Sequence, residues 1–99
     1  MANICTNMFF CSTENEKNLE KVSEFIKTNF NTYYENDGEE DSFECEFESR
    51  WSCPDDELDK MVKSLEPDDT LYIRVLSYEF GCEYAQFLIY SDGCWTQKM

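Results

Sequence analysis

The residues best suited to chemistry are carboxylates, and they are concentrated in the middle of the chain. Residues 36–48 read NDGEEDSFECEFE, in which seven of thirteen positions are Asp or Glu and none is Lys or Arg. Carboxylates can hold a metal ion, exchange protons or attract a basic surface. Successive side chains of a strand alternate between its faces, so Glu44, Glu46 and Glu48 should form a row with a spacing of about 6.6–6.8 Å.

More acidic residues flank this row on both sides. Eleven of the 22 acidic residues fall between positions 37 and 59. We expect the hairpin loop to extend the row on one side and the start of a helix to extend it on the other. The resulting set of candidate partner-binding residues is Asp37, Glu39, Glu40, Asp41, Glu44, Glu46, Glu48, Asp55, Asp56, Glu57 and Asp59. The alternative is that these residues only keep the protein solvated.

Catalysis and metal binding are poorly supported by the residues present. The chain has no His and only three Gly, so it lacks the commonest general base and any Gly-rich phosphate loop. The acidic loop does not follow the spacing of a calcium-binding EF-hand. We therefore expect no enzyme activity, no metal and no cofactor.

The six cysteines are interpreted as reduced residues that fill space. They contain no Cys-x-x-Cys pair, and without His the usual zinc spacings are missing. The N-terminal residues do not resemble a signal peptide, and no segment is apolar enough to span a bilayer. We therefore expect a cytoplasmic protein with free thiols, several of them at strand positions.

Overall charge limits the class of partner. The 99 residues carry a net charge of −14, and 41% of them are hydrophobic. A folded core is therefore expected, whereas nucleic acid and anionic membranes would be repelled. A basic protein surface is the favoured partner.

The elements that position these residues follow from periodicity. Strands are expected at 3–11, 32–34, 43–50, 71–76 and 84–90, and the tail from 91 to 99 is expected to be loose. A helix should cover about 14–29, with Thr13 as N-cap and Glu16 at N3. A second helix should start with Pro54 at N1 and end before Pro67. The prediction is one α+β domain over residues 1–99, a ferredoxin-like antiparallel sheet of four to five strands with two helices on one face (β-α-β-β-α-β-β).

Three short motifs give a resemblance. The opening MANICTN is similar to a Met-Ala-Asn-Trp-Cys-x-Asn start, with Ile4 where Trp is usual. The passage FESRWSCP from strand to helix, and YEFG before the last predicted strand, are the other two. Together they resemble the YubB-type ferredoxin-like family of small proteins encoded by phages, plasmids and other mobile elements. The resemblance implies this fold and genomic setting and no particular activity.

Three functions remain open at this point. The leading hypothesis is a non-enzymatic acidic protein of a phage or mobile element that binds a basic, nucleic-acid-binding surface of a host protein. It would block that surface as a DNA mimic, for example as an anti-defence or anti-CRISPR inhibitor of a nuclease. The alternative is a small ligand- or metal-binding accessory domain, with Trp51, Tyr78 and Phe80 lining an aromatic pocket. A catalytic domain with buried carboxylates is the third.

Overall fold

The computed structural model describes residues 4–36, 41–50 and 52–98. Within them the strands are β1 (Ile4–Ser12), β2 (Thr32–Asn36), β3 (Ser42–Arg50), β4 (Tyr72–Glu79), β5 (Tyr84–Ser91) and β6 (Cys94–Gln97). The helices are α1 (Glu16–Asn29) and α2 (Asp55–Lys63), with a short 3-10 turn at Phe80–Cys82. The predicted strands and helices are therefore present, and β6 is an addition.

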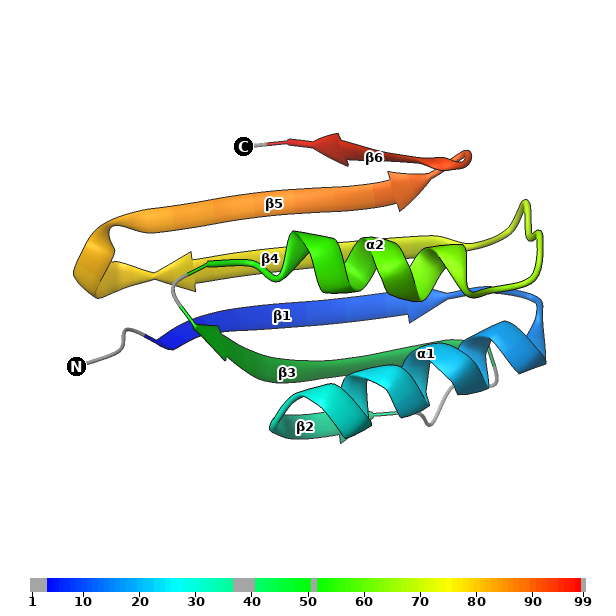
Figure 1. Cartoon of the computed structure of the whole chain (residues 1–99), viewed down its shortest axis with the longest axis horizontal. Helices are drawn as coiled ribbons and strands as arrows, with labels where there is room; N and C mark the ends of the chain where they lie inside the picture. The colour runs from blue at the N-terminus through cyan, green and yellow to red at the C-terminus, as the bar shows by residue number, and fades with distance from the viewer. Residues whose placement is uncertain (1–3, 37–40, 51, 99) are drawn as a thin grey trace.

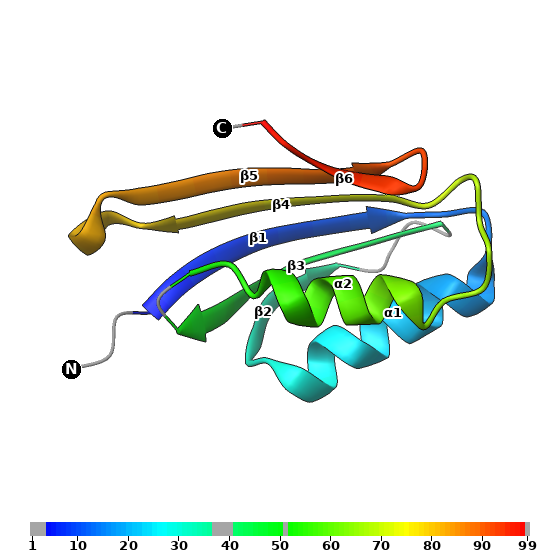
Figure 2. The same ribbon diagram turned by 45° about the horizontal axis from the view of Figure 1, so that its top comes forward.

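The strands form one antiparallel sheet in the order β2-β3-β1-β4-β5-β6. Both helices lie on the same face of the sheet, α1 in front of β2 and β3 and α2 in front of β1 and β4 (Figure 1). The turned view in Figure 2 shows both helices on one side of the sheet and no helix on the other side. We call this uncovered side the open face. The arrangement is consistent with the ferredoxin-like plan, but the sheet has six strands instead of four to five.

The core lies between the helices and the helix-facing side of the sheet. Phe9 packs between Phe43 and Phe47, at ring-centroid distances of 6.3 and 5.9 Å. The predicted alternation of β3 is confirmed, because Phe43, Cys45 and Phe47 are at most 5% exposed. Val22 and Ile26 of α1 and Leu58 and Met61 of α2 are buried against this layer. Truncating one of these Phe side chains to Ala should cost about 3–5 kcal/mol of folding stability.

The N-terminus of α1 differs from the predicted capping box. The N-cap is Asn15, whose side chain accepts a hydrogen bond of 3.1 Å from the backbone N–H of Asn18. Thr13 lies outside the helix, where its hydroxyl accepts from the N–H of Asn15 and hydrogen-bonds with Asp68. Thr13 is therefore part of a link between two loops, and Glu16 is the first residue of the helix.

Asp68 is the centre of that link. Its carboxylate accepts hydrogen bonds from Asn18 Nδ2 at 3.2 Å and from the Thr70 backbone N–H at 2.9 Å, in addition to the Thr13 contact. Burial disfavours the charged carboxylate, but these hydrogen bonds outweigh it and lower the pKa of Asp68 to about 2. The ionised carboxylate thus ties the loop before α1 to the loop before β4.

The start of α2 is close to its predicted place. Pro54 is the N-cap residue and Asp55 is the first helical residue, one position later than expected. Pro54 supplies no side-chain cap, and the acidic first turn complements the helix dipole.

The tail is ordered as a strand, which corrects the expectation that it is loose. Asp92 and Gly93 form a two-residue turn with φ values of 54° and 81°, typical of a type I′ hairpin. Ser91 and Cys94 pair across the turn, and Trp95 packs edge-on against Tyr90 at 5.2 Å between ring centroids. This packing extends the sheet by one strand.

Candidate functional site

The carboxylate row predicted on β3 lies on the open face. Glu44, Glu46 and Glu48 alternate with the three buried residues of the strand and therefore point away from the helices. Their direct neighbours on β1 are Phe10, Met8 and Thr6, respectively. Side chains paired in this way lie about 4.5–5.5 Å apart at Cβ. Two of the three glutamates thus lie next to large apolar side chains.

An apolar centre continues from β1 across the open face. The strand register places Met8 beside Leu76 of β4, and Leu76 beside Phe87 of β5. Met8 is 45% exposed, although it lies in the middle of a sheet. These residues surround a hollow of about 370 Å³, which we call the open-face hollow. Its lining includes Met8, Phe10, Leu76 and Phe87 together with Glu44, Glu46, Arg74 and Tyr34.

A bulge in β2 places Tyr34 in the lining of the open-face hollow. The register between β2 and β3 shifts between Tyr33 and Asn36, and Tyr34 has a left-handed φ of 54°. Such a conformation is unfavourable for a large side chain. Tyr34 is 82% exposed and lines the hollow. The bulge therefore presents an aromatic ring beside the carboxylates.

The neighbouring Tyr33 is tied to the acidic row. Its hydroxyl donates a hydrogen bond of 2.8 Å to Glu48, and this bond raises the pKa of the Tyr33 phenol. Glu48 is therefore partly engaged within the chain by a hydrogen bond. None of the three glutamates takes part in either ion pair found in the described residues.

The acidic residues of α2 lie elsewhere. Because α2 covers the opposite face of the sheet, Asp55, Asp56, Glu57 and Asp59 do not continue the row on β3 (Figure 1). Asp59 forms an ion pair of 2.9 Å with Lys63, and Asp55 accepts a hydrogen bond from Gln86. The expected single acidic field is therefore two separate groups, because the chain passes from one face of the sheet to the other between β3 and α2.

The loop part of the predicted set is only partly visible. Asp37, Glu39 and Glu40 lie outside the described residues. Asp41 is exposed, and its backbone carbonyl accepts a hydrogen bond of 3.0 Å from the N–H of Thr13. Their part in binding stays a prediction.

The aromatic alternative is also only partly described. Tyr78 and Phe80 stack at 4.9 Å between ring centroids, and Phe80 is 80% exposed. Trp51, the third residue of the predicted pocket, lies outside the described residues. The open-face hollow is lined by other aromatic residues, Phe10, Tyr34 and Phe87.

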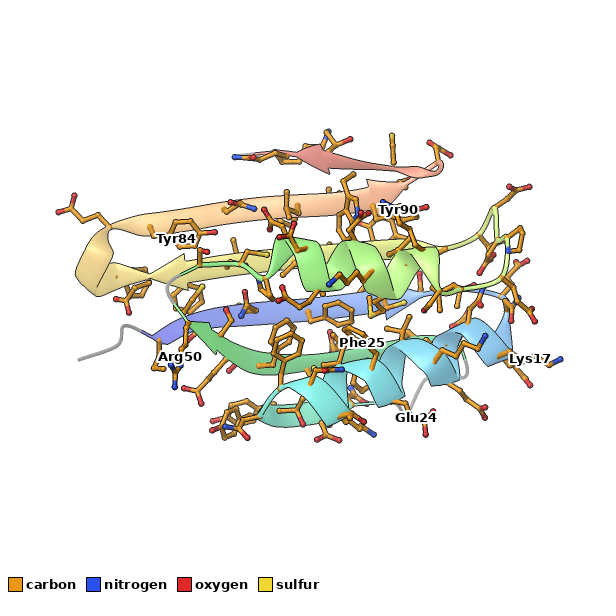
Figure 3. The ribbon with its side chains drawn as sticks, viewed as in Figure 1. Lys17, Glu24, Phe25, Arg50, Tyr84 and Tyr90 are labelled. Carbon is orange, nitrogen blue, oxygen red and sulfur yellow. The ribbon has the colours of Figure 1, made fainter. Side chains whose placement is uncertain are left out.

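Positive charge is concentrated on the helices. Three lysines lie on α1 and two on α2. Figure 3 shows Lys17 and Glu24 projecting outward from α1. On the open face, Arg74 lies with its guanidinium carbon 4.3 Å from the ring centroid of Phe10. The open face thus already holds a cation against an aromatic ring.

The buried cysteines are poorly suited to nucleophilic chemistry. Cys11, Cys45 and Cys53 are buried, and loss of hydration raises the pKa of each thiol to about 12. Burial likewise raises the pKa of Cys5. These thiols are protonated near neutral pH and hence unreactive. The prediction that strand cysteines fill space is confirmed for Cys5, Cys11 and Cys45.

The described residues contain neither a cluster of metal ligands nor a membrane-spanning helix. Among the described residues, no three Cys, Asp or Glu side chains are grouped so as to hold a metal ion. No helix in the same part of the chain is long and apolar enough to cross a membrane.

The sequence predicted the carboxylates of the site but not its apolar centre. The apolar centre is built from β1, β4 and β5, which meet only through the order of strands in the sheet. The sequence feature that could have indicated this centre is the presence of apolar residues on both faces of residues 3–11.

Comparison with known proteins found no matching family model, no similar curated protein and no similar solved structure, so the YubB-type resemblance stays a prediction.

Proposed function

We propose that this chain is a non-enzymatic acidic interaction protein that binds a basic, nucleic-acid-binding surface of another protein and blocks it as a nucleic-acid mimic. The observation that carries the proposal is the row of Glu44, Glu46 and Glu48 on a face that no described helix covers. Their spacing of about 6.6–6.8 Å follows from strand geometry. It is comparable to the separation of successive phosphates in a nucleic-acid strand.

The charge of the whole chain supports the same class of partner. A net charge of −14 repels nucleic acid and attracts basic surfaces, and it accelerates their association. The buried, protonated thiols and the absence of His from the sequence argue against nucleophilic or His-based catalysis. The YubB-type resemblance and a ferredoxin-like fold fit a protein of a phage or mobile element, cytoplasmic in its host. A defence nuclease is then a suitable target, and the chain an anti-CRISPR-like inhibitor.

A capture experiment tests the proposal. The tagged protein is incubated with host lysate at 0.1 M salt, and the bound proteins are identified and then challenged with double-stranded DNA and with 1 M salt. We expect a nucleic-acid-binding protein to be retained and to be released by both challenges. DNA should release it because both would occupy the same basic surface, and 1 M salt should release it because the Debye length falls from about 10 Å to about 3 Å. Retention that neither DNA nor salt affects would contradict nucleic-acid mimicry.

A further inference from the structure

We infer that the open-face hollow is the anchor point for a partner segment that carries arginine or lysine next to apolar side chains. The inference rests on the proposed function and assigns it a site. The row of glutamates then gives only part of the recognition, and the apolar centre beside it gives the rest.

The first argument is the uncovered apolar surface. A sheet normally buries its apolar face against another layer, and here the helices cover one face only. Met8 is 45% exposed in the middle of the sheet, between Glu46 of β3 and Leu76 of β4. Contiguous exposed apolar surface rimmed by polar residues marks interaction sites.

The second argument is charge, which selects the occupant. Glu44 and Glu46 line the hollow, and neither belongs to an ion pair in the part of the chain that the structure describes. A second copy of the chain would carry the same net charge of −14 and be repelled. Arginine and lysine fit better, because their carbon stems pack on apolar walls while the charged ends reach carboxylates.

Arg74 already makes a contact of this kind on the open face, with its cation against an aromatic ring. Its side chain lines the hollow, and its guanidinium lies over the ring of Phe10. Tyr34, 82% exposed at the rim, offers a second aromatic ring to an incoming cation. The hollow of about 370 Å³ is near the lower end of the range of about 300–1,000 Å³ for ligand sites, which suits a side-chain anchor.

The test uses three synthetic peptides of equal length that are labelled for fluorescence anisotropy. One alternates blocks of Arg and Leu so as to form an amphipathic helix, the second replaces Leu with Ser, and the third replaces Arg with Glu. We expect the Arg/Leu peptide to bind at least about tenfold more tightly than the Arg/Ser peptide, since an apolar anchor is lost. The Glu/Leu peptide should not bind. Equal affinity for Arg/Leu and Arg/Ser, or no binding of Arg/Leu, would overturn the inference.

Variants locate the binding site. Met8→Ser and the double variant Glu44→Gln/Glu46→Gln should each weaken Arg/Leu binding about tenfold or more. The matched control is Glu20→Gln/Glu24→Gln, which removes the same charge from exposed positions on α1. Amide NMR spectra of each variant verify the fold, and shifts in wild type should gather on β1, β3 and β4. Equal weakening by the control double variant, or shifts confined to α2, would overturn the assignment.

Failure of this inference and failure of the proposed function are distinguishable. If the lysate capture remains sensitive to DNA while Met8→Ser and Glu44→Gln/Glu46→Gln leave it unchanged, the mimicry stands and the hollow is not its anchor. If the Arg/Leu peptide binds the hollow but DNA does not release the protein captured from lysate, the hollow is a binding site and the proposal of nucleic-acid mimicry is wrong.

Discussion

The guanidinium carbon of Arg74 lies 4.3 Å from the ring centroid of Phe10, on the face of the sheet opposite the helices. Phe10 in turn lies directly across from Glu44 on β3. A cation, an aromatic ring and a carboxylate thus cross three adjacent strands in one line. In the proposed complex, Arg74 competes with the partner's own cations for this aromatic and acidic surface.

Removal of this internal cation should strengthen binding. We expect Arg74→Gln to raise the affinity for the Arg/Leu peptide about two- to fivefold, because an exposed charge interaction is worth about 0.3–1 kcal/mol. Fluorescence anisotropy measures the change. Lys17→Gln removes the same charge from α1, which covers the other face of the sheet, and is the control. Affinity that falls, or rises equally in the control, would count against the competition.

Charge reversal of the row tests its role directly. Glu44, Glu46 and Glu48 changed together to Lys should leave the fold intact, because surface substitutions cost within about 0.5 kcal/mol each. The substitution of Glu48 should reduce stability more than the other two, since Glu48 accepts the Tyr33 hydrogen bond. Binding to a basic partner should be abolished, as measured by titration calorimetry. The control changes Glu14, Glu20 and Glu24 to Lys; all three are exposed, and Glu20 and Glu24 lie on α1, which covers the other face of the sheet. A folded triple variant that binds normally would show the row to be only a solvated surface.

The loop link through Asp68 predicts a defined acid response. The pKa of Asp68 is lowered to about 2 in the folded protein, against about 3.9 in an unfolded chain. Its stabilisation is therefore complete above about pH 4 and is lost as the pH falls toward 2. Asp68→Asn should cost about 1–2 kcal/mol at pH 7, because hydrogen bonds to a charged group are removed. The difference from wild type should shrink between pH 4 and 2.

Urea unfolding across that pH range measures the effect. Asp69→Asn, at the next and exposed position, is the matched control and should change stability little at any pH. A constant difference between wild type and Asp68→Asn down to pH 2 would mean that the Asp68 charge does not stabilise the link.

Sequence periodicity predicted which residues form the core layers of this fold better than it predicted the helix cap, the edge strand and the neighbouring strands. The alternation of Phe43, Cys45 and Phe47 is a local property, and the structure confirms it. The prediction of Thr13 as the N-cap of α1 was wrong, because the Thr13 hydroxyl hydrogen-bonds to Asp68, 55 residues further along the chain. The strand at 94–97 was missed although Asp92-Gly93 is a typical hairpin turn. The hollow depends on which strands become neighbours, and the sequence pattern of one strand does not contain that information.

The cysteines should show two classes of reactivity. In denaturant without oxidant, all six thiols should titrate as free, and a loss of two or more, or stoichiometric zinc, would contradict this. In the native protein, Cys94 is exposed and should react with a thiol reagent at once. Cys5, Cys11, Cys45 and Cys53 should react only after unfolding, because burial raises the pKa of each thiol. Native-state modification of these four as fast as Cys94 would show that the core opens readily.

Ionic strength separates the two contributions to binding. Long-range attraction to a chain of net charge −14 depends on the Debye length, which shrinks from about 10 Å at 0.1 M to about 3 Å at 1 M salt. The association rate with a basic partner should therefore fall steeply with salt. The dissociation rate should change less, because contacts around Met8 and Leu76 are already partly desolvated. Surface plasmon resonance gives both rates. An association rate that stays flat from about 0.05 to 0.5 M salt would contradict electrostatic steering. It would favour the apolar alternative, with Trp51, Tyr78 and Phe80 as the first residues to mutate.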